Sequence, residues 1–531
     1  MTVTAASTTI HAPAREASAQ QRLNYLIFTL CTSLYFLPFM RFLRLGTDEG
    51  TLVYGAVRIV HGKVFARDFF EVMGPGTLYW LAMFFKLFGV TFVATRVCLF
   101  LTSLGTALLI YLLTRRVCRR YQALPCILLF ATYFSGQWPA ISHHVDSNFF
   151  ALLSVVCIVH WQDKRKDSLL FAAGVLAGVT TCIHLPKGML LLVSILLWLW
   201  LQRQRRSAAS ISALGFVMGG YGGFVGIVLA YFWSRGALWD LVYVNFVWPS
   251  RHYGAMNTVA YAQGLVSFYW DPWVVAMSGS TWAAAMASVL IIPFLFVAAL
   301  PALLLILGAR CKWKMMRPEI LLYWLCGWAL WLSELHRKDI SHLVFGSPLL
   351  IILCIHLLVE RREKVASIAL QIFSISAGCL ACFNLFLILV MSAHPIATRV
   401  GTVAVFRSDP VLTFLDEHVA PGEEIFAYPY SPMYYFLSTT TNPTRYSILL
   451  YNYNTPSQFE EVIRVLDQRR VRYVLWDTRF EVKAADTFFS ASKRMRAHDF
   501  IIEPYLESHY NVVKTEDGMR IMERKSEADA D

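Results

Sequence analysis

The residues best suited to chemistry lie in short polar stretches between long apolar runs. The first stretch, residues 46–50, holds the adjacent acids Asp48 and Glu49 directly after the first apolar run. Placing an acid at the edge of a membrane costs desolvation energy unless the acid stays hydrated or is paired. Acids at this position are therefore candidates for a functional role. The alternative is that Thr47 caps a helix whose first turn favours acids. The pattern alone leaves both interpretations open.

Two further positions combine an acid with histidine or arginine. Asp146 follows His143 and His144 at the start of an apolar run, where it either serves function or caps a helix. Histidine is a zinc ligand, but adjacent histidines point in different directions on a regular backbone, which weakens this pair as a metal site. Asp68 follows Arg67. This pair is either functional or a local ion pair that shapes its loop.

Basic residues form two candidate sites for an anion. Lys187 lies in a Pro-Lys-Gly turn between two apolar runs, where it either reaches the interface or binds an anion. A later cluster holds Arg337, Lys338 and His342. Arginine can hold two phosphate oxygens at once, and we expect His336 and Asp339 to support this cluster.

Composition identifies the class of protein that positions these residues. The chain has 531 residues, of which 57% are hydrophobic and 15% charged, whereas soluble domains carry about 25% charged residues. Apolar runs of about 20 residues can cross a bilayer. We predict about eleven such spans, at 23–40, 92–114, 121–138, 147–162, 168–185, 188–202, 213–233, 281–307, 318–334, 342–359 and 365–392.

The charged loops predict the orientation of the spans. Lys and Arg cluster in loops that fall on one side under this count, at 115–120, 164–166, 203–206, 310–317 and 361–364. This pattern places the loops and the N-terminus in the cytoplasm, and it argues against a nucleic-acid-binding stripe despite the net charge of +12. Segment 76–88 is too short to span and would reverse the sides, so we predict an interfacial or re-entrant helix. The segments 41–91 and 234–280 then form large outer loops.

The chain divides into three parts. We predict a disordered cytoplasmic tail at 1–22, a transmembrane module at 23–392, and an outer domain at 393–531. In the outer domain the sequence predicts strands at 423–430 and 471–477, helices at 431–438 and 456–470, and a hairpin at 511–524 that turns at Asp517-Gly518. This alternation is typical of a small α/β domain.

Four motifs in order resemble the GT-C glycosyltransferases, in particular the dolichyl-phosphate-mannose protein mannosyltransferase and aminoarabinose transferase group, glycosyltransferase family 39. They are DEGxxxY followed by RDFFEVMGPGxxYW, HLPKGMLLL, HRKDISHLVFGSPLL, and PGEEIFAYPYSPMYYFLSTTTNPTRY in the outer domain. The resemblance covers nearly the whole chain from about residue 40. It implies a multi-pass helical membrane protein of GT-C type with an extracytoplasmic α/β domain.

The resemblance also implies an activity. The donor is a sugar linked to a polyprenyl phosphate, and transfer takes place on the outer face of the inner (plasma) membrane. Asp48 matches the catalytic base, with Glu49 beside it, and Asp146 matches a second acid. The resemblance implies a divalent cation (Mg, Mn or Zn), for which Asp48 and Asp146 are candidate ligands. His143 and His144 are further candidates from the sequence itself and lie outside the motifs that carry the resemblance. We expect Arg337, His342 and Lys187 to bind the donor phosphate.

Two other functions remain open from the sequence. A membrane transporter or lipid flippase would place ionisable residues near the bilayer midplane and show inverted repeats. A non-catalytic relative would keep the fold without the activity. The acids and bases gather at one face and no repeat is visible, so the sequence favours an enzyme. The sugar and the acceptor, which is a lipid, a glycan or a protein, remain open.

Overall fold

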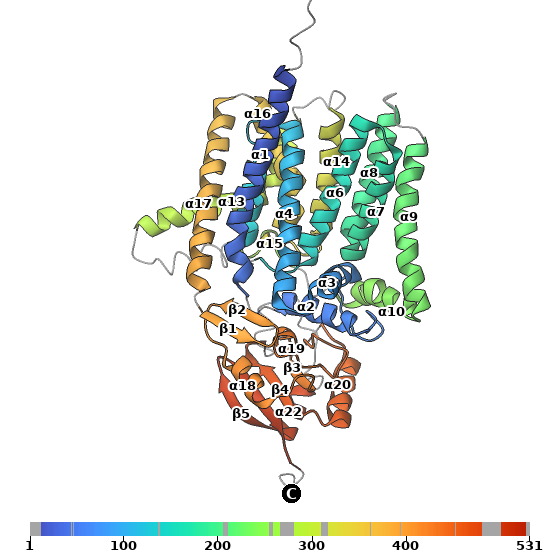
Figure 1. The fold of residues 1–531 in the computed structure, drawn as a ribbon, viewed down its shortest axis with the longest axis vertical. Helices are drawn as coiled ribbons and strands as arrows, with labels where there is room; N and C mark the ends of the chain where they lie inside the picture. The colour runs from blue at the N-terminus through green and yellow to red at the C-terminus, as the bar shows by residue number, and fades with distance from the viewer. Residues whose placement is uncertain are drawn as a thin grey trace, which may run out of the picture.

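The computed structural model consists of a helical bundle with a smaller α/β domain at one end (Figure 1). It describes residues 12–43, 45, 47–135, 139–204, 211–253, 259–265, 281–309, 317–361, 363–392, 394–451, 453–480 and 501–526. The N-terminal helix enters the bundle at one end, and the C-terminal domain lies at the other. All statements below concern these described residues.

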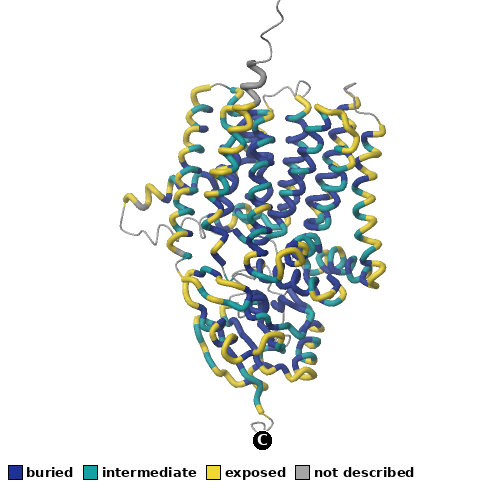
Figure 2. The backbone as a smooth tube through the Cα atoms, viewed as in Figure 1, coloured by how far each residue is buried: buried dark blue, intermediate teal, exposed yellow. Residues whose placement is uncertain are grey.

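Every predicted span contains a helix of the bundle. These helices are α1 (Ala12–Phe36), α4 (Phe92–Val117), α5 (Leu124–Phe134), α6 (His143–Lys164), α7 (Asp167–Ile183), α8 (Leu185–Gln204), α9 (Ile211–Ser234), α13 (Thr281–Ala309), α14 (Pro318–Ser333), α15 (Ile340–Gly346), α16 (Pro348–Arg361) and α17 (Lys364–Met391). Outer helices expose apolar side chains: Ile227 on α9 is 71% exposed and Ile375 on α17 is 64% exposed. Figure 2 shows the contrast between this exposed outer surface and the buried interior, which is the pattern of a bundle that faces lipid.

The predicted number of spans is only partly confirmed. Among the described residues, 7 helices are long and apolar enough to cross a membrane, or 8 if the bent pair α15 and α16 is one span. Helices α5 and α7 are apolar but shorter, and α14 has 16 residues. The predicted span 342–359 is a broken one, bent by 72° between Gly346 and Pro348. Proline at the start of α16 explains this break, because it lacks the amide that would continue α15.

The N-terminal tail differs from the prediction. Residues 1–11 lie outside the described part of the chain, but α1 already begins at Ala12, inside the segment 1–22 that we expected to be disordered. Alanine, arginine, glutamate and glutamine predominate in this part of α1, and their high helix propensity extends the first span toward the N-terminus.

Short helices separate the bundle from the outer domain (Figure 1). They are α2 (Thr47–Val60), α3 (Pro75–Phe88) and α10 (Leu238–Val242), the last continued by π-helical turns at Tyr243–Val247 and Pro249–Tyr253. Helix α3 is the segment that we predicted to be interfacial, and in Figure 1 it lies beneath the ends of the long helices. The N-cap of α3, Gly74, lies close to α7: a Cβ added at Gly74 would lie 2.4 Å from the Cys182 carbonyl oxygen.

The outer domain confirms the predicted alternation of strands and helices. Its sheet has the order β3-β4-β6-β5, in which β3 (Ile425–Tyr428) runs parallel to β4 (Tyr473–Asp477) and β5 (Tyr510–Glu516) forms a hairpin with β6 (Met519–Arg524). Its helices are α18 (Pro410–His418), α19 (Met433–Leu437), α20 (Pro456–Arg469) and α22 (Ile502–His509). An antiparallel pair that we did not predict, β1 (His394–Thr398) and β2 (Gly401–Val405), connects the bundle to this domain.

Backbone contacts join the first outer loop to the outer domain. Leu43 N donates to the Ala404 carbonyl at 2.8 Å, and Phe70 N donates to the Arg445 carbonyl at 2.8 Å. The Arg58 side chain donates to the Thr444 carbonyl at 2.9 Å. The predicted catalytic loop and the outer domain therefore form one continuous structure.

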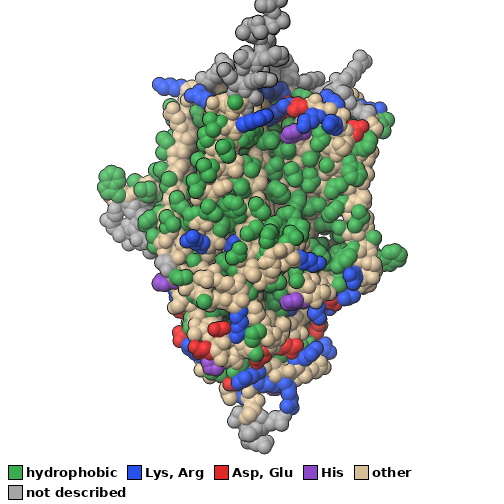
Figure 3. Space-filling model, viewed as in Figure 1, with side chains coloured by type: hydrophobic (Ala, Val, Ile, Leu, Met, Phe, Trp, Pro, Cys, Tyr) green, Lys and Arg blue, Asp and Glu red, His purple; other side chains and the backbone are tan. Residues whose placement is uncertain are grey.

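Lys and Arg gather at the end of the bundle opposite the outer domain, which Figure 3 shows as a blue rim. Within the described residues this end carries the predicted basic loops between α4 and α5, between α6 and α7, and between α16 and α17. The loop 310–316 lies outside the described residues. This distribution agrees with the charge pattern on which the predicted orientation depends.

Candidate functional site at the junction of the bundle and the outer domain

Asp48 lies where α2 meets the outer domain. It is in the first turn of α2, together with Glu49. The hydroxyl of Tyr430, which follows β3, donates a hydrogen bond to the Asp48 carboxylate. Burial, together with the negative charge of Asp48, raises the pKa of the Tyr430 phenol well above its ordinary value, so that this hydroxyl remains protonated and donates at neutral pH.

Helix α2 approaches the outer domain so closely that it requires a glycine. A Cβ added at Gly50 would lie 2.6 Å from the backbone nitrogen of Met433, which begins α19. Asn442 N also donates to the Tyr54 hydroxyl at 2.7 Å. These contacts fix the start of α2, and with it Asp48, against the outer domain.

Glu49 has a different environment from its neighbour. Its Oε1 lies 2.9 Å from Nη1 of Arg96 on α4, and both side chains are buried. The same oxygen accepts a hydrogen bond from Ile141 N at 3.1 Å. The structure therefore places Glu49 in a buried ion pair that joins α2 to α4 and to the segment before α6, whereas Asp48 is exposed.

Asp146 is buried in the first turn of α6, whose N-cap is Ser142. One of its carboxylate oxygens, Oδ2, has no hydrogen-bond partner among the described residues. A buried carboxylate oxygen without a partner is costly. Capping therefore does not explain Asp146 fully, because the side chain that caps α6 is that of Ser142.

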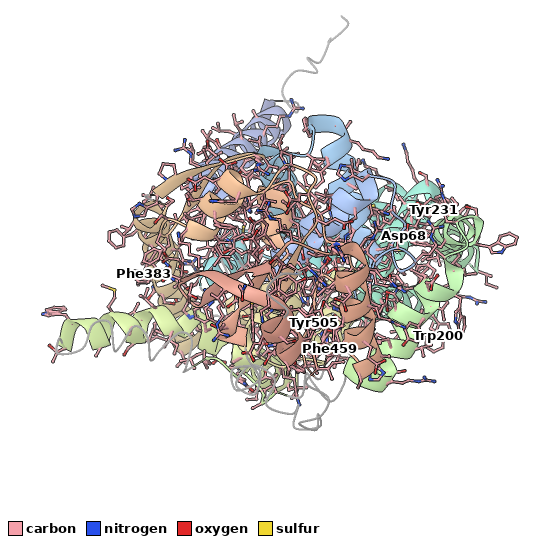
Figure 4. All side chains as sticks on the ribbon, turned by 90° about the horizontal axis from the view of Figure 1, so that it is seen from below. Asp68, Trp200, Tyr231, Phe383, Phe459 and Tyr505 are labelled. Atoms are coloured by element: carbon pink, nitrogen blue, oxygen red, sulfur yellow. The ribbon has the colours of Figure 1, made fainter. Side chains whose placement is uncertain are left out.

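Arg67 and Asp68 form the local ion pair that was one of the two interpretations of their sequence. Arg67 Nε lies 2.8 Å from Asp68 Oδ1, and Arg67 also donates to the Arg235 carbonyl after α9 at 2.7 Å. The bond from Arg67 lowers the pKa of the Asp68 carboxyl. Figure 4, viewed from the outer-domain end, shows Asp68 near Tyr231 of α9. The pair thus connects the first outer loop to α9.

Arg337, Asp339 and His342 form one network at the start of α15. Asp339 is the N-cap of this helix, and its carboxylate lies 2.7 Å from Arg337 Nε and 2.8 Å from His342 Nδ1. Burial alone would raise the pKa of the Asp339 carboxyl, but His342 and Arg337 hold this pKa below its ordinary value. The Lys338 carbonyl accepts from Ala262 N at 2.8 Å, which joins the cluster to the second outer loop.

Lys187 is paired with an acid that we did not predict. Its Nζ lies 2.7 Å from Oε1 of Glu334, and both side chains are fully buried. Lys187 also donates to the Asn148 side chain at 2.9 Å. His144 lies on the other side of this acid, with Nδ1 3.0 Å from Glu334 Oε2. The charge of Lys187 is therefore balanced within the protein.

The predicted metal ligands separate into two places. Among the described residues, no group of three closely spaced histidine, cysteine or acidic side chains includes Asp48 or Asp146. Groups that are close enough to share an ion do include the predicted His143 and His144. Their members are His143, His144, His184, Glu334, His336 and His342. A divalent cation therefore fits the histidine cluster better than it fits the two aspartates.

Some of these residues could not be identified from sequence patterns. Tyr430 lies 382 positions from Asp48 in the chain. It belongs to the outer-domain motif PGEEIFAYPYSPMYYFLSTTTNPTRY, but the motif alone does not indicate that its hydroxyl contacts Asp48. Glu334 did carry a signal, since it is an acid at the end of an apolar run.

Comparison with known proteins gives one family match and two similar crystal structures. Residues 73–232, which include α3 and most of α9, match the family model described as dolichyl-phosphate-mannose-protein mannosyltransferase. No curated protein matches the chain. Two crystal structures of ArnT from Cupriavidus metallidurans, one bound to undecaprenyl phosphate and one in the apo state, are each 12% identical to it. Each match covers 95% of this chain and 98% of that chain, with TM-scores of 0.39 and 0.43 respectively.

The family match includes the Gly74-Pro75-Gly76 turn and Lys187, which belong to motifs recognised in the sequence, and also Asp146. Over residues 73–232 the chain is therefore similar to the dolichyl-phosphate-mannose-protein mannosyltransferase family, which confirms the family resemblance recognised in its sequence.

Proposed function

We propose that this protein is an integral membrane glycosyltransferase that moves a sugar from a polyprenyl phosphate to an envelope acceptor on the outer face, with Asp48 as the base. One observation carries the proposal: Asp48 is the exposed acid at the junction, and a hydroxyl group already binds its carboxylate. The Tyr430 hydroxyl marks a position that an acceptor hydroxyl can take. The family match over residues 73–232 supports sugar transfer as the reaction.

In the proposed reaction the acceptor oxygen attacks the anomeric carbon of the sugar. Asp48 takes the proton of the acceptor hydroxyl as the new carbon–oxygen bond forms. The bond between the anomeric carbon and the phosphate oxygen breaks, and its electron pair leaves with the polyprenyl phosphate. A single displacement with one base inverts the anomeric centre, in contrast to the retaining route with two carboxylates.

The leaving phosphate needs positive charge on the outer face. Arg337 and His342 are suited to this role, because their side chains are 29% and 16% exposed beside Asp339. Lys187, which we also considered, is fully buried against Glu334, and its charge is already balanced. We therefore assign the phosphate contact to Arg337 and His342, and to Lys187 a structural role.

Glu49 and Asp146 have different proposed roles. Glu49 keeps α2 in place through its ion pair with Arg96, and it is a positioning residue for Asp48. Asp146 retains an unpaired oxygen next to the histidine-rich start of α6. We propose that this oxygen binds a hydroxyl of the sugar or acceptor.

The test is transfer by the Asp48→Asn variant in liposomes. This variant keeps the shape of the side chain and removes the base, so we expect turnover to fall by roughly a hundredfold or more, with donor KM little changed. Asp416→Asn is the matched control, since the Asp416 side chain is 73% exposed on the outer domain. Near-normal turnover by Asp48→Asn would remove Asp48 as the base.

A further inference from the structure

One face of α2 lies against the outer domain from its first turn to its last, and Figure 1 shows α2 beside α19. Four side chains on this face follow one another at intervals of three or four residues, which places them on the same side of a helix: Asp48, Thr51, Tyr54 and Arg58. The Tyr54 ring stacks on Tyr435, with centroids 4.7 Å apart. Arg58 donates to the Thr444 carbonyl at 2.9 Å. The outer domain therefore contacts α2 through a continuous row of side chains.

The Tyr430 hydroxyl joins the first two members of this row. It donates a hydrogen bond to Asp48 Oδ1, and the Thr51 side chain makes a hydrogen bond with it. A phenol has one proton, which goes to Asp48, so its oxygen accepts the proton of the Thr51 hydroxyl. Donation thus runs from Thr51 to Tyr430 and on to Asp48. Both ends of this chain of hydrogen bonds lie on α2, and its middle member belongs to the outer domain.

The Tyr430 side chain is enclosed where it meets α2. It is 8% exposed, and Thr51 is 0% exposed. The residue before it, Pro429, accepts a hydrogen bond from Leu449 N at 2.8 Å, which fixes the backbone that carries the ring. The close approach of α2 at Gly50 also leaves little room for the two elements to shift. The Tyr430 hydroxyl is therefore held at one place relative to the start of α2.

Asp48 needs such a restraint, because it is exposed. An exposed aspartate side chain samples several rotamers, and holding it in one of them costs conformational entropy. Tyr430 bonds Oδ1, and the described residues make no hydrogen bond with Oδ2. An acceptor hydroxyl can therefore bind Oδ2 in the same way that the Tyr430 hydroxyl binds Oδ1.

We propose that Tyr430 is a positioning residue, which together with Thr51 orients the Asp48 carboxylate so that its second oxygen meets the acceptor hydroxyl. The proposal rests on the proposed role of Asp48 as the base. It gives the outer domain a part in the reaction, because this domain supplies the group that fixes the base. Small misplacements of a reacting group reduce the rate strongly. Tyr430 touches neither substrate in this scheme, so its hydroxyl should affect the maximal rate of transfer and not substrate binding.

The test measures transfer by Tyr430→Phe, which keeps the ring and removes the hydroxyl. The full-length protein is placed in liposomes with the polyprenyl-phosphate lipid extract of cells that lack the protein, at increasing amounts, and with envelope membranes of the same cells as acceptor. We expect the maximal rate to fall roughly tenfold, while the half-saturating amounts of extract and of membranes stay unchanged. Thr51→Val should give a smaller loss of the same kind, and it replaces Tyr430→Phe if that variant is not monodisperse.

Tyr434→Phe is the matched control. Tyr434 lies in the same domain, is 6% exposed, and donates its hydroxyl to a different acid, Asp409, at 2.9 Å. Its variant loses a buried hydrogen bond of the same type, so Tm should fall about as much as in Tyr430→Phe. The maximal rate of Tyr434→Phe should stay at the wild-type value. An equal loss of rate in both variants would show that a loosened outer domain is the cause, and it would overturn the proposal.

A double variant separates action through Asp48 from any other effect. In the Asp48→Asn background, Tyr430→Phe should cause no further loss of rate, because the base that it positions is already absent. A further loss as large as in the wild type would overturn the proposal. Near-normal transfer by Asp48→Asn alone would instead remove the proposed function. Full activity of Tyr430→Phe beside an inactive Asp48→Asn would overturn the positioning role and leave the base in place.

Discussion

Replacing Glu71 by glutamine is expected to stabilise the folded protein at about pH 8 and to leave its stability at about pH 4 unchanged. Glu71 lies between α2 and α3 and is 1% exposed. Burial raises the pKa of this carboxyl from 4.5 to about 8, and the hydrogen bond from Ser447 and the positive charge of Arg58 offset only part of the effect.

The direction of this pH effect on stability follows from the pH range in which each state of the chain keeps the Glu71 proton. The folded chain keeps the Glu71 proton up to about pH 8, whereas the unfolded chain loses it near 4.5. The contribution of Glu71 to the free energy of unfolding is therefore complete below pH 4.5 and is lost as the pH rises through 8. At about 1.4 kcal/mol per pH unit, the cost reaches about 5 kcal/mol at pH 8, as an upper bound. Glutamine has no charge to bury, so it avoids this cost.

The assay is thermal unfolding of the purified protein in detergent at both pH values. Glu71→Gln should raise Tm by several degrees at about pH 8 and change it little at about pH 4. Glu417→Gln is the control, because its side chain is 64% exposed on α18, and it should leave Tm unchanged at either pH. An equal shift of Tm for Glu71→Gln at both pH values would refute the burial argument.

Two further predictions concern the phosphate cluster and the orientation of the chain. Arg337→Lys preserves charge but removes the planar fork of donors, so the donor KM should rise roughly tenfold whatever sugar is attached. A KM within error of the wild type would show that the cluster only anchors its loop. A reporter fused to the C-terminus should be active outside the cytoplasm, because the basic loops lie at the opposite end of the bundle. Cytoplasmic activity of that reporter would place the outer domain, and Asp48 with it, on the cytoplasmic side and would contradict the predicted orientation.

Much of the architecture follows from local sequence patterns. The apolar runs predicted where the bundle helices lie, and the alternation in the last part of the chain predicted β3, β4, α20 and the β5–β6 hairpin. Length and composition could not predict the bend between α15 and α16, or that α5 and α14 are short. The bend follows from Pro348 at the start of α16, whereas the lengths of α5 and α14 depend on how these helices pack against their neighbours.

The site was less predictable because its partners are distant in sequence. Asp48 was identified as an acid after an apolar run, but its contact with Tyr430 depends on how the outer domain folds onto α2. Lys187 was predicted to face a phosphate, since Glu334, far along the chain, could not be placed beside it. A local pattern can mark a charged residue, but only the fold shows whether another residue already balances that charge.

The measurement that tests the central claim most directly is the mass of envelope glycans made in cells. Three strains are compared: one that lacks the protein, one that carries the wild type, and one that carries Asp48→Asn at equal abundance in the membrane. If the protein is a glycosyltransferase with Asp48 as its base, one sugar should appear on an acceptor in the wild-type strain alone. The same sugar in the Asp48→Asn strain, or no difference in glycans between the wild-type strain and the strain without the protein, would contradict the account.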